Sequence, residues 1–159
     1  MRVRALDANG DMTFGRGSAN FLINSPAAVA QLVQTGLEEF LPLAQRKNMG
    51  VMLAGVFNSG ILATGAISGA TFDYAVAPEA IVTKVKKIEE VCKAHKTTIR
   101  QAALQFSMAH AAVVSIVLGA VAPEEVKENV HDATVKIPAS LWTDLKSAGL
   151  LAADAPTAS

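Results

Sequence analysis

The chain has 159 residues, of which 51% are hydrophobic and 18% charged, with 14 basic and 14 acidic side chains. This length and apolar content suffice for one domain with a buried core. The balanced charge excludes a strongly basic nucleic-acid-binding face, and no apolar run is long enough to span a bilayer. The N-terminal residues contain no hydrophobic signal region, and a single cysteine, Cys92, excludes an intrachain disulfide. We therefore expect a cytoplasmic protein with neither nucleic-acid nor membrane partners.

The N-terminal residues 1–20 are rich in turn formers and poor in apolar side chains. This composition predicts a loose arm, with a short hairpin at Asn9-Gly10. A short strand is expected at residues 21–23 and a helix at residues 27–34, which Ser25-Pro26 would cap and begin.

A second helix is expected over residues 37–47, with a kink or a late start caused by Pro42. The following run, Met49 to Gly55, is short, apolar and bounded by glycine, which is typical of a strand buried on both faces of a parallel sheet. Gly60 and Gly65 bracket the next loop, and such a loop can bring bare backbone amides close to an anion. The simpler interpretation, a buried strand and its turn, stays open at this point.

The remaining sequence alternates between helical and strand-like patterns. Helices are expected at residues 79–95, 99–108, 124–131 and 140–147, and a second buried strand at residues 111–118. Thr97 or Thr98 would cap the second of these helices, and the tail from Ala152 is expected to fray. The alternation predicts an α/β fold whose parallel strands are joined by crossover helices.

Two polar pairs have simple interpretations. Cys92 and His95 stand three apart on a predicted helix, a spacing that two metal ligands can use. No second Cys/His pair completes a site, so solvated helix residues are the better interpretation and no metal is expected. Asp73 and Tyr74 lie in the loop before the long helix, where they either contact a ligand or close the loop.

The end of the second strand is more informative. Gly119-Ala120 follows the strand, and Pro123 starts a helix that carries Glu124 and Glu125. The free amides and dipole of a helix N-terminus favour an anion, although these glutamates oppose a phosphate and suit a ribose hydroxyl. Two adjacent loops of this kind, after the last two strands, match the phosphate site of a β/α barrel.

A family resemblance is carried by five segments in a fixed order and spacing, at residues 37–43, 55–65, 102–106, 117–120 and 124–129. Through them the chain resembles the C-terminal part of an aldo/keto reductase, from about Leu37 to Leu151. It is most similar to the branch of L-fucose and D-threo-aldose 1-dehydrogenases and pyridoxal 4-dehydrogenases. The resemblance implies an NAD(P)-dependent oxidoreductase on a (β/α)8 TIM barrel, of which this chain supplies about strands 6 to 8.

The resemblance also implies a dinucleotide site built from two groups of residues. The residues that would line the pyrophosphate are Phe57, Asn58, Ser59, Gly60 and Leu62. Those that would approach the adenosine phosphate are Gly119, Ala120 and Val121, and those near the adenine and ribose are Glu125, Glu128 and Asn129. Many NADP-preferring relatives carry a basic residue around Val121 or Glu125, and its absence here favours NAD over NADP.

The family's catalytic Asp, Tyr, Lys and His come from a part that this chain does not match, so no catalytic residue is assigned. We expect weak cofactor binding and no turnover by this chain alone. Residues 10–34 resemble the start of a small phage-tail protein, which predicts a junction near Thr35-Gly36. The expected organisation is an arm at 1–35, a partial barrel at 36–151 and a tail at 152–159.

A partial barrel leaves sheet edges open, and open edges need a cover. We expect these edges to be covered by a second copy of the chain in a homodimer, by the N-terminal arm, or by a separate chain that complements the barrel. The alternative function is a non-catalytic structural or interaction protein from a recombined or truncated gene.

Overall fold

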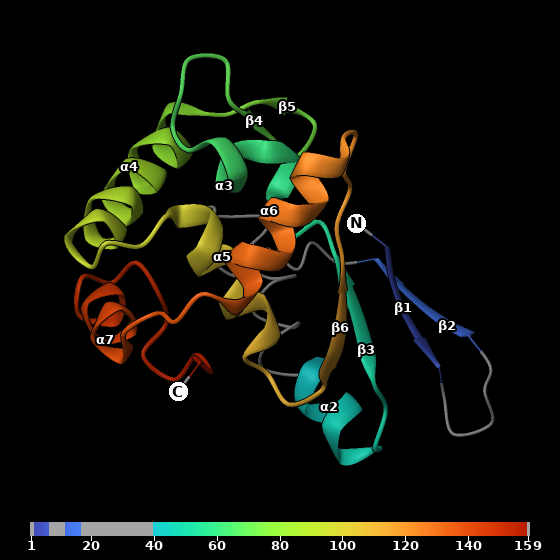
Figure 1. Ribbon diagram of the computed structural model, residues 1–159. Coiled ribbons are helices and arrows are strands. Elements are labelled where there is room, and N and C mark those ends of the chain that lie inside the picture. Colours follow the sequence, from blue (N-terminus) through green and yellow to red (C-terminus); the bar gives the residue numbers. More distant parts are fainter. Residues whose placement is uncertain (1, 7–11, 17–39, 159) are drawn as a thin grey trace.

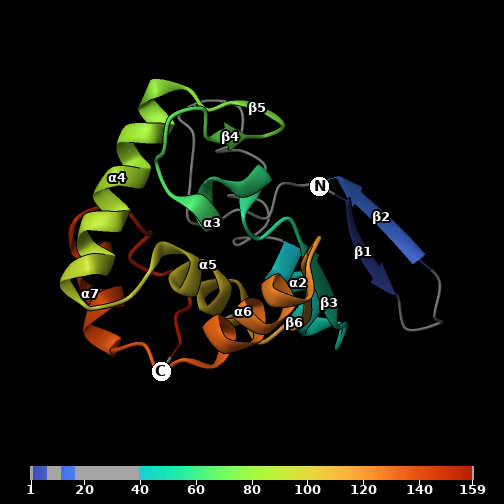
Figure 2. The same ribbon diagram turned by 45° about the horizontal axis from the view of Figure 1, so that its top comes forward.

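The computed structural model describes residues 2–6, 12–16 and 40–158. A four-stranded sheet has the order β2-β1-β3-β6, and a separate two-stranded sheet pairs β4 with β5. The helices gather on one side of β3 and β6, whereas the β1–β2 hairpin extends the sheet away from them (Figures 1 and 2). The expected strand at 21–23, the helix at 27–34 and the junction near Thr35-Gly36 lie outside the described residues.

The N-terminal arm forms a hairpin. β1 (Arg2–Leu6) and β2 (Met12–Arg16) pair antiparallel along their whole length, which confirms the predicted pairing, while the Asn9-Gly10 turn lies outside the described residues. β1 also pairs antiparallel with β3 (Val51–Ala54). In its described residues the arm is therefore not loose, because they add two strands to the sheet and cover one edge of β3, as an incomplete barrel requires.

β3 and β6 (Val113–Val117) run parallel, which confirms the predicted pairing of the two apolar runs. Their last residues, Ala54 and Val117, are direct partners in the register. Because the carboxyl ends of parallel strands meet at one edge of a sheet, the loops after β3 and β6 leave the sheet side by side.

The two strands are not buried on both faces, so this prediction is wrong. In β3 the buried Val51 and Leu53 flank Met52, which is 52% exposed, and β6 exposes Val114 and Val117. Over the described part of the chain, the helices pack against one face of this pair. Its other face therefore keeps apolar side chains in contact with solvent.

Six helices follow the described arm: α2 (Leu41–Arg46), α3 (Ile61–Thr64), α4 (Glu79–Ala94), α5 (Ile99–Met108), α6 (Pro123–Thr134) and α7 (Ala139–Ser147). The last four confirm the predicted helices. α2 contains Pro42 in its first turn, in agreement with a late start, although residues 37–39 are not described. None of the described helices combines the length and the apolar character needed to cross a bilayer.

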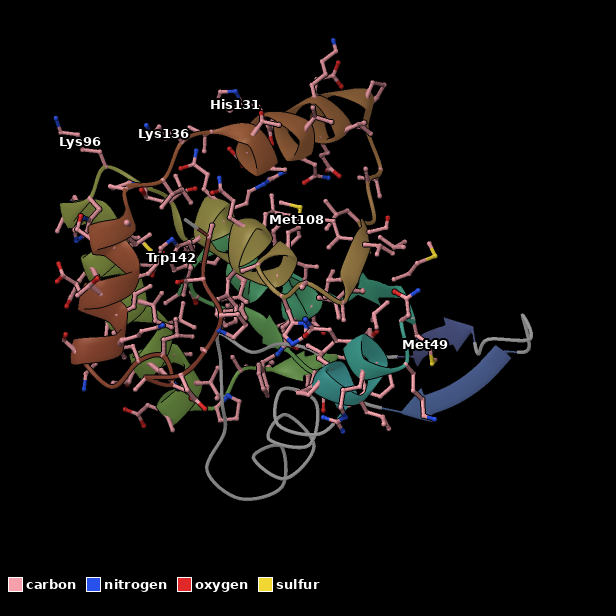
Figure 3. All side chains as sticks on the ribbon, turned by 90° about the horizontal axis from the view of Figure 1, so that it is seen from below. Met49, Lys96, Met108, His131, Lys136 and Trp142 are labelled. Atoms are coloured by element: carbon pink, nitrogen blue, oxygen red, sulfur yellow. The ribbon has the colours of Figure 1, made fainter. Side chains whose placement is uncertain are left out.

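α5 lies at the centre of the core. Thr98 and Gln101 form a reciprocal capping box that starts the helix. The side chains of Ala102, Leu104 and Phe106 are buried beneath the surrounding helices. The Trp142 ring, on the inner side of α7 (Figure 3), lies 6.2 Å from the Phe106 ring, centroid to centroid.

The tail is not frayed at Ala155. This residue is buried and belongs to the main hydrophobic cluster, as do Leu150 and Leu151 just before the expected tail. Gly149 ends α7 with a positive φ of 65°, which turns the chain back onto the core. The expectation of a frayed tail missed this return, because single small residues such as Ala155 give no periodic signal.

Replacing Leu104 by alanine tests the central position of α5. The side chain is fully buried, so Leu104→Ala should lower the free energy of unfolding by roughly 2–5 kcal/mol in a urea titration. Met108→Ala, on the same helix but 37% exposed, is the matched control and should cost clearly less. Equal losses for the two variants would contradict the described packing.

Candidate functional site

The loop after β3 is held by its own backbone. The Asn58 N–H donates to the Gly55 carbonyl at 2.9 Å, and the N–H groups of Gly60 and Leu62 donate to the Phe57 carbonyl at 3.0 and 3.2 Å. Gly60 has a φ of 112°, a conformation that side-chain-bearing residues rarely adopt. The glycine-rich pattern suggested bare backbone amides, but these three amides already donate hydrogen bonds within the loop. An anion would have to compete with those bonds.

A small hairpin, β4 (Thr71–Phe72) and β5 (Ala75–Val76), closes over this loop. Its turn residues Asp73 and Tyr74 have positive φ angles, and so do Asn58 and Ser59 in the loop below. The Asp73 N–H donates to Asn58 Oδ1 at 3.2 Å, and the Tyr74 N–H donates to Ser59 Oγ at 2.9 Å. Of the two roles considered for Asp73-Tyr74, the structure supports closure of the loop.

Leu62 has a different place from its predicted neighbours. Its side chain is fully buried in the main hydrophobic cluster, as is that of Ile61. The residue therefore anchors α3 to the core, and its side chain does not reach the surface of the loop.

The loop after β6 is open. Gly119, Ala120 and Val121 are exposed, Val121 to 95%, and a Cβ placed on Gly119 would meet no atom within 4 Å. The Val121 N–H donates to Glu125 Oε2 at 2.9 Å, so this carboxylate lies at the N-terminal end of α6. That position agrees with the preference of helix N-termini for negative charge.

The side chain of Arg100, in the first turn of α5, connects the two groups of predicted residues. Its Nη2 donates to Asn129 Oδ1 at 2.7 Å, and its Nη1 lies 3.2 Å from Glu128 Oε2. Its Nε lies 3.0 Å from Asp132 Oδ2 as an ion pair, without the alignment of a hydrogen bond. The guanidinium carbon also lies 5.4 Å from the centroid of the Phe57 ring, within the range of a cation–π contact.

Arg100 thus brings together Phe57, Glu128 and Asn129 of the predicted set. The structure places no hydrogen bond between the Gly119–Val121 segment and the Asn58–Gly60 turn, in the part of the chain that it describes. Sequence reasoning missed Arg100. The available signal was a cation in the first turn of an otherwise uncharged helix, with several acidic residues and an asparagine on the helix that follows the next strand.

The interpretation of Cys92 and His95 as solvated residues is wrong for Cys92, which is buried, whereas the side chain of His95 is 15% exposed. Cys92 is 1% exposed, and burial, with a smaller contribution from Glu89, raises the pKa of its thiol to about 12. The His95 Nε2 lies 2.7 Å from Asp144 Oδ2, and Ser140 Oγ lies 3.2 Å from Nδ1. Both side chains therefore hold α4 against its neighbours. No group of three or more His, Cys, Asp or Glu side chains that could hold a metal occurs in the described ranges.

Comparison with known proteins shows what the chain is similar to. A model of the family described as "Aldo/keto reductase family" matches residues 26–149, including ten residues before the expected junction. A pyridoxal 4-dehydrogenase of Microbacterium luteolum is 42% identical over 120 residues, which cover 76% of this chain and 35% of the relative. A D-threo-aldose 1-dehydrogenase of Pseudomonas sp is 31% identical over 150 residues, 94% of this chain and 42% of the relative. The chain thus spans 35 to 42% of the length of these relatives.

The Asn58–Asp73 bond gives a test of the closed loop. Asn58→Ala removes the acceptor of the Asp73 N–H and places alanine at a positive φ, so we expect a loss of about 1–3 kcal/mol in the free energy of unfolding. Hydrogen exchange at the Asp73 amide should accelerate. Ser68→Ala, at an exposed position of the same segment, is the control. Unchanged exchange at Asp73 would contradict the described loop.

The buried thiol predicts a pH dependence of stability. Because the folded state raises the Cys92 pKa, the unfolded state releases the proton first as pH rises. The free energy of unfolding should therefore fall from about pH 9 towards pH 12, and less steeply in Cys92→Ala.

Native Cys92 should also react slowly with a thiol reagent at pH 8 and rapidly in urea. Rapid labelling of the native protein would contradict its burial.

Proposed function

Because the chain belongs to the aldo/keto reductase family, whose fold is a (β/α)8 barrel, we propose that it carries the dinucleotide-binding side of an NAD(P)-dependent oxidoreductase. Its described strands form an open sheet rather than a closed barrel, so the chain corresponds to part of that fold. When bound, the nicotinamide would supply the hydride exchanged with a carbon of a sugar or aldehyde.

The chemistry of the loop after β6 fits the adenosine end of a dinucleotide. Backbone at Gly119 is open to close approach, and the exposed start of α6 offers polar groups to a ribose. We assign the pyrophosphate to residues 57–60, and Leu62 to their support through the core. The adenosine end is assigned to Gly119, Ala120, Val121, Glu125, Glu128 and Asn129.

The bond between Glu125 and the Val121 N–H carries the proposed preference for NAD. The carboxylate already occupies the N-terminal end of α6, and the exposed Glu124 lies beside it. A 2′-phosphate at this position would meet like charge, whereas a ribose 2′-hydroxyl can donate to a carboxylate. The site therefore favours NAD over NADP.

We propose no catalytic residue in this chain. Tyr74, its only tyrosine, is highly exposed at the tip of the hairpin, and its backbone serves to close the loop. In our proposal the chain binds the cofactor without turnover unless a complementing barrel half supplies the acid–base groups. The two relatives are named for pyridoxal and for D-threo-aldose, and we propose substrates of these classes for the complete protein.

The exposed apolar face of β3 and β6 favours a second candidate function. Met52, Val114 and Val117 are large, apolar and exposed on adjacent strands. Such a face is typical of an interaction surface. A non-catalytic structural or interaction protein, or a homodimer formed through this face, would use it without any cofactor.

Titration of the purified chain with NADH and NADPH, followed by cofactor fluorescence, tests the proposed function. We expect saturable binding with higher affinity for NADH. Glu125→Arg should raise the affinity for NADPH about tenfold, because a guanidinium pairs with a phosphate. Glu124→Arg, one residue away, makes the same charge change without removing the bond to Val121, and should have a smaller effect. Failure of both cofactors to bind would favour the non-catalytic alternative.

A further inference from the structure

We propose that Arg100 is a positioning residue of the dinucleotide site, which fixes the orientation of the Asn129 amide and ties the loop after β3 to α6. The inference rests on the proposed function and assigns a role to a residue outside the predicted set. Its basis is the set of contacts that one guanidinium makes to two segments far apart in the sequence.

The contact with Arg100 decides how the Asn129 amide is oriented. A guanidinium has five N–H donors and no acceptor, so the Asn129 atom 2.7 Å from Nη2 must be the carbonyl oxygen. The two Nδ2 donors then point away from Arg100. Asn129 is buried, and a fixed pair of donors at the edge of the site suits an acceptor such as an adenine ring nitrogen.

Arg100 is itself held in one position. Asp132, whose side chain is 14% exposed, lies 3.0 Å from Nε, and the more exposed Glu128 lies 3.2 Å from Nη1. The guanidinium thus donates a hydrogen bond to the Asn129 oxygen and forms ion pairs with these two carboxylates. A planar fork engaged in this way holds a fixed orientation, which a lysine ammonium cannot reproduce.

The contact with Phe57 connects the guanidinium to the loop after β3. Phe57 follows β3 and accepts two backbone hydrogen bonds within its loop, so its ring is attached to a rigid turn. The guanidinium lies against that ring while it bonds to Asn129 on α6. One side chain from the central helix therefore links the loop after β3 to α6, the helix whose Glu128 and Asn129 are proposed to bind the adenosine end of the cofactor.

A double-mutant cycle in NADH titrations separates positioning from general stability. Arg100→Lys keeps the positive charge and loses the fork, and we expect about a tenfold loss of NADH affinity, as for Asn129→Ala. The losses in the double variant should be less than additive, because Arg100 acts in part through Asn129. Lys136→Ala, on the outward side after α6 (Figure 3), is the control and should bind as the parent chain does.

Asn129→Asp provides a second variant that should fold. The aspartate keeps an acceptor for Arg100 but lacks the Nδ2 donors, so thermal stability should be retained while NADH affinity falls about tenfold. Parent-like NADH binding by Asn129→Asp or by a folded Arg100→Lys would overturn the inference, and so would additive losses in the cycle.

The cofactor-free protein supplies an independent readout. In ¹⁵N-edited spectra, Arg100→Lys should shift the side-chain amide pair of Asn129, whereas Lys136→Ala should not. An unmoved pair in Arg100→Lys would overturn the positioning role whatever the cofactor does. Absence of NADH binding by the parent chain, together with a shifted pair, would overturn the proposed function and the inferred role in binding, and would leave only a structural contact.

Discussion

The contacts of the Arg100 guanidinium link the loop after β3, through Phe57, to α6, the helix that follows the loop after β6. The cation is largely buried, and burial of a charge is costly unless partners compensate it. Glu128, Asp132 and the Asn129 carbonyl provide that compensation from α6. The capping box at Thr98 fixes where α5 begins, and so places Arg100 in the first turn, facing these acceptors.

The parallel pair β3–β6 makes this arrangement possible. Its register brings Ala54 and Val117 side by side, so that both loops begin at the same edge. The N-terminal hairpin covers the other edge of β3, while one face of the pair keeps exposed apolar side chains. The same sheet therefore supports the cofactor site in one proposal and an interaction surface in the other.

Helices α4 to α7 could be predicted from the sequence because they carry local signals, such as the apolar stripe of α4 or the Thr98 cap of α5, whereas the four-residue α3 was expected to be part of a loop. The parallel pairing followed from two apolar runs joined by helices. The exposure of Met52 and the burial of Cys92 were missed, because both depend on which elements pack together. The role of Arg100 was missed for the same reason. Its partners on α6 lie 28 to 32 residues further along the chain, and Phe57 lies in an earlier loop.

We propose that the loops after β3 and β6 form one dinucleotide site. Backbone ¹⁵N–¹H spectra of the purified chain, recorded during an NADH titration, can test this proposal residue by residue. We expect saturable shifts at Phe57–Gly60, Gly119–Val121 and Asn129, with α7 unaffected. The absence of shifts at high NADH, or shifts confined to the exposed face of β6, would contradict it.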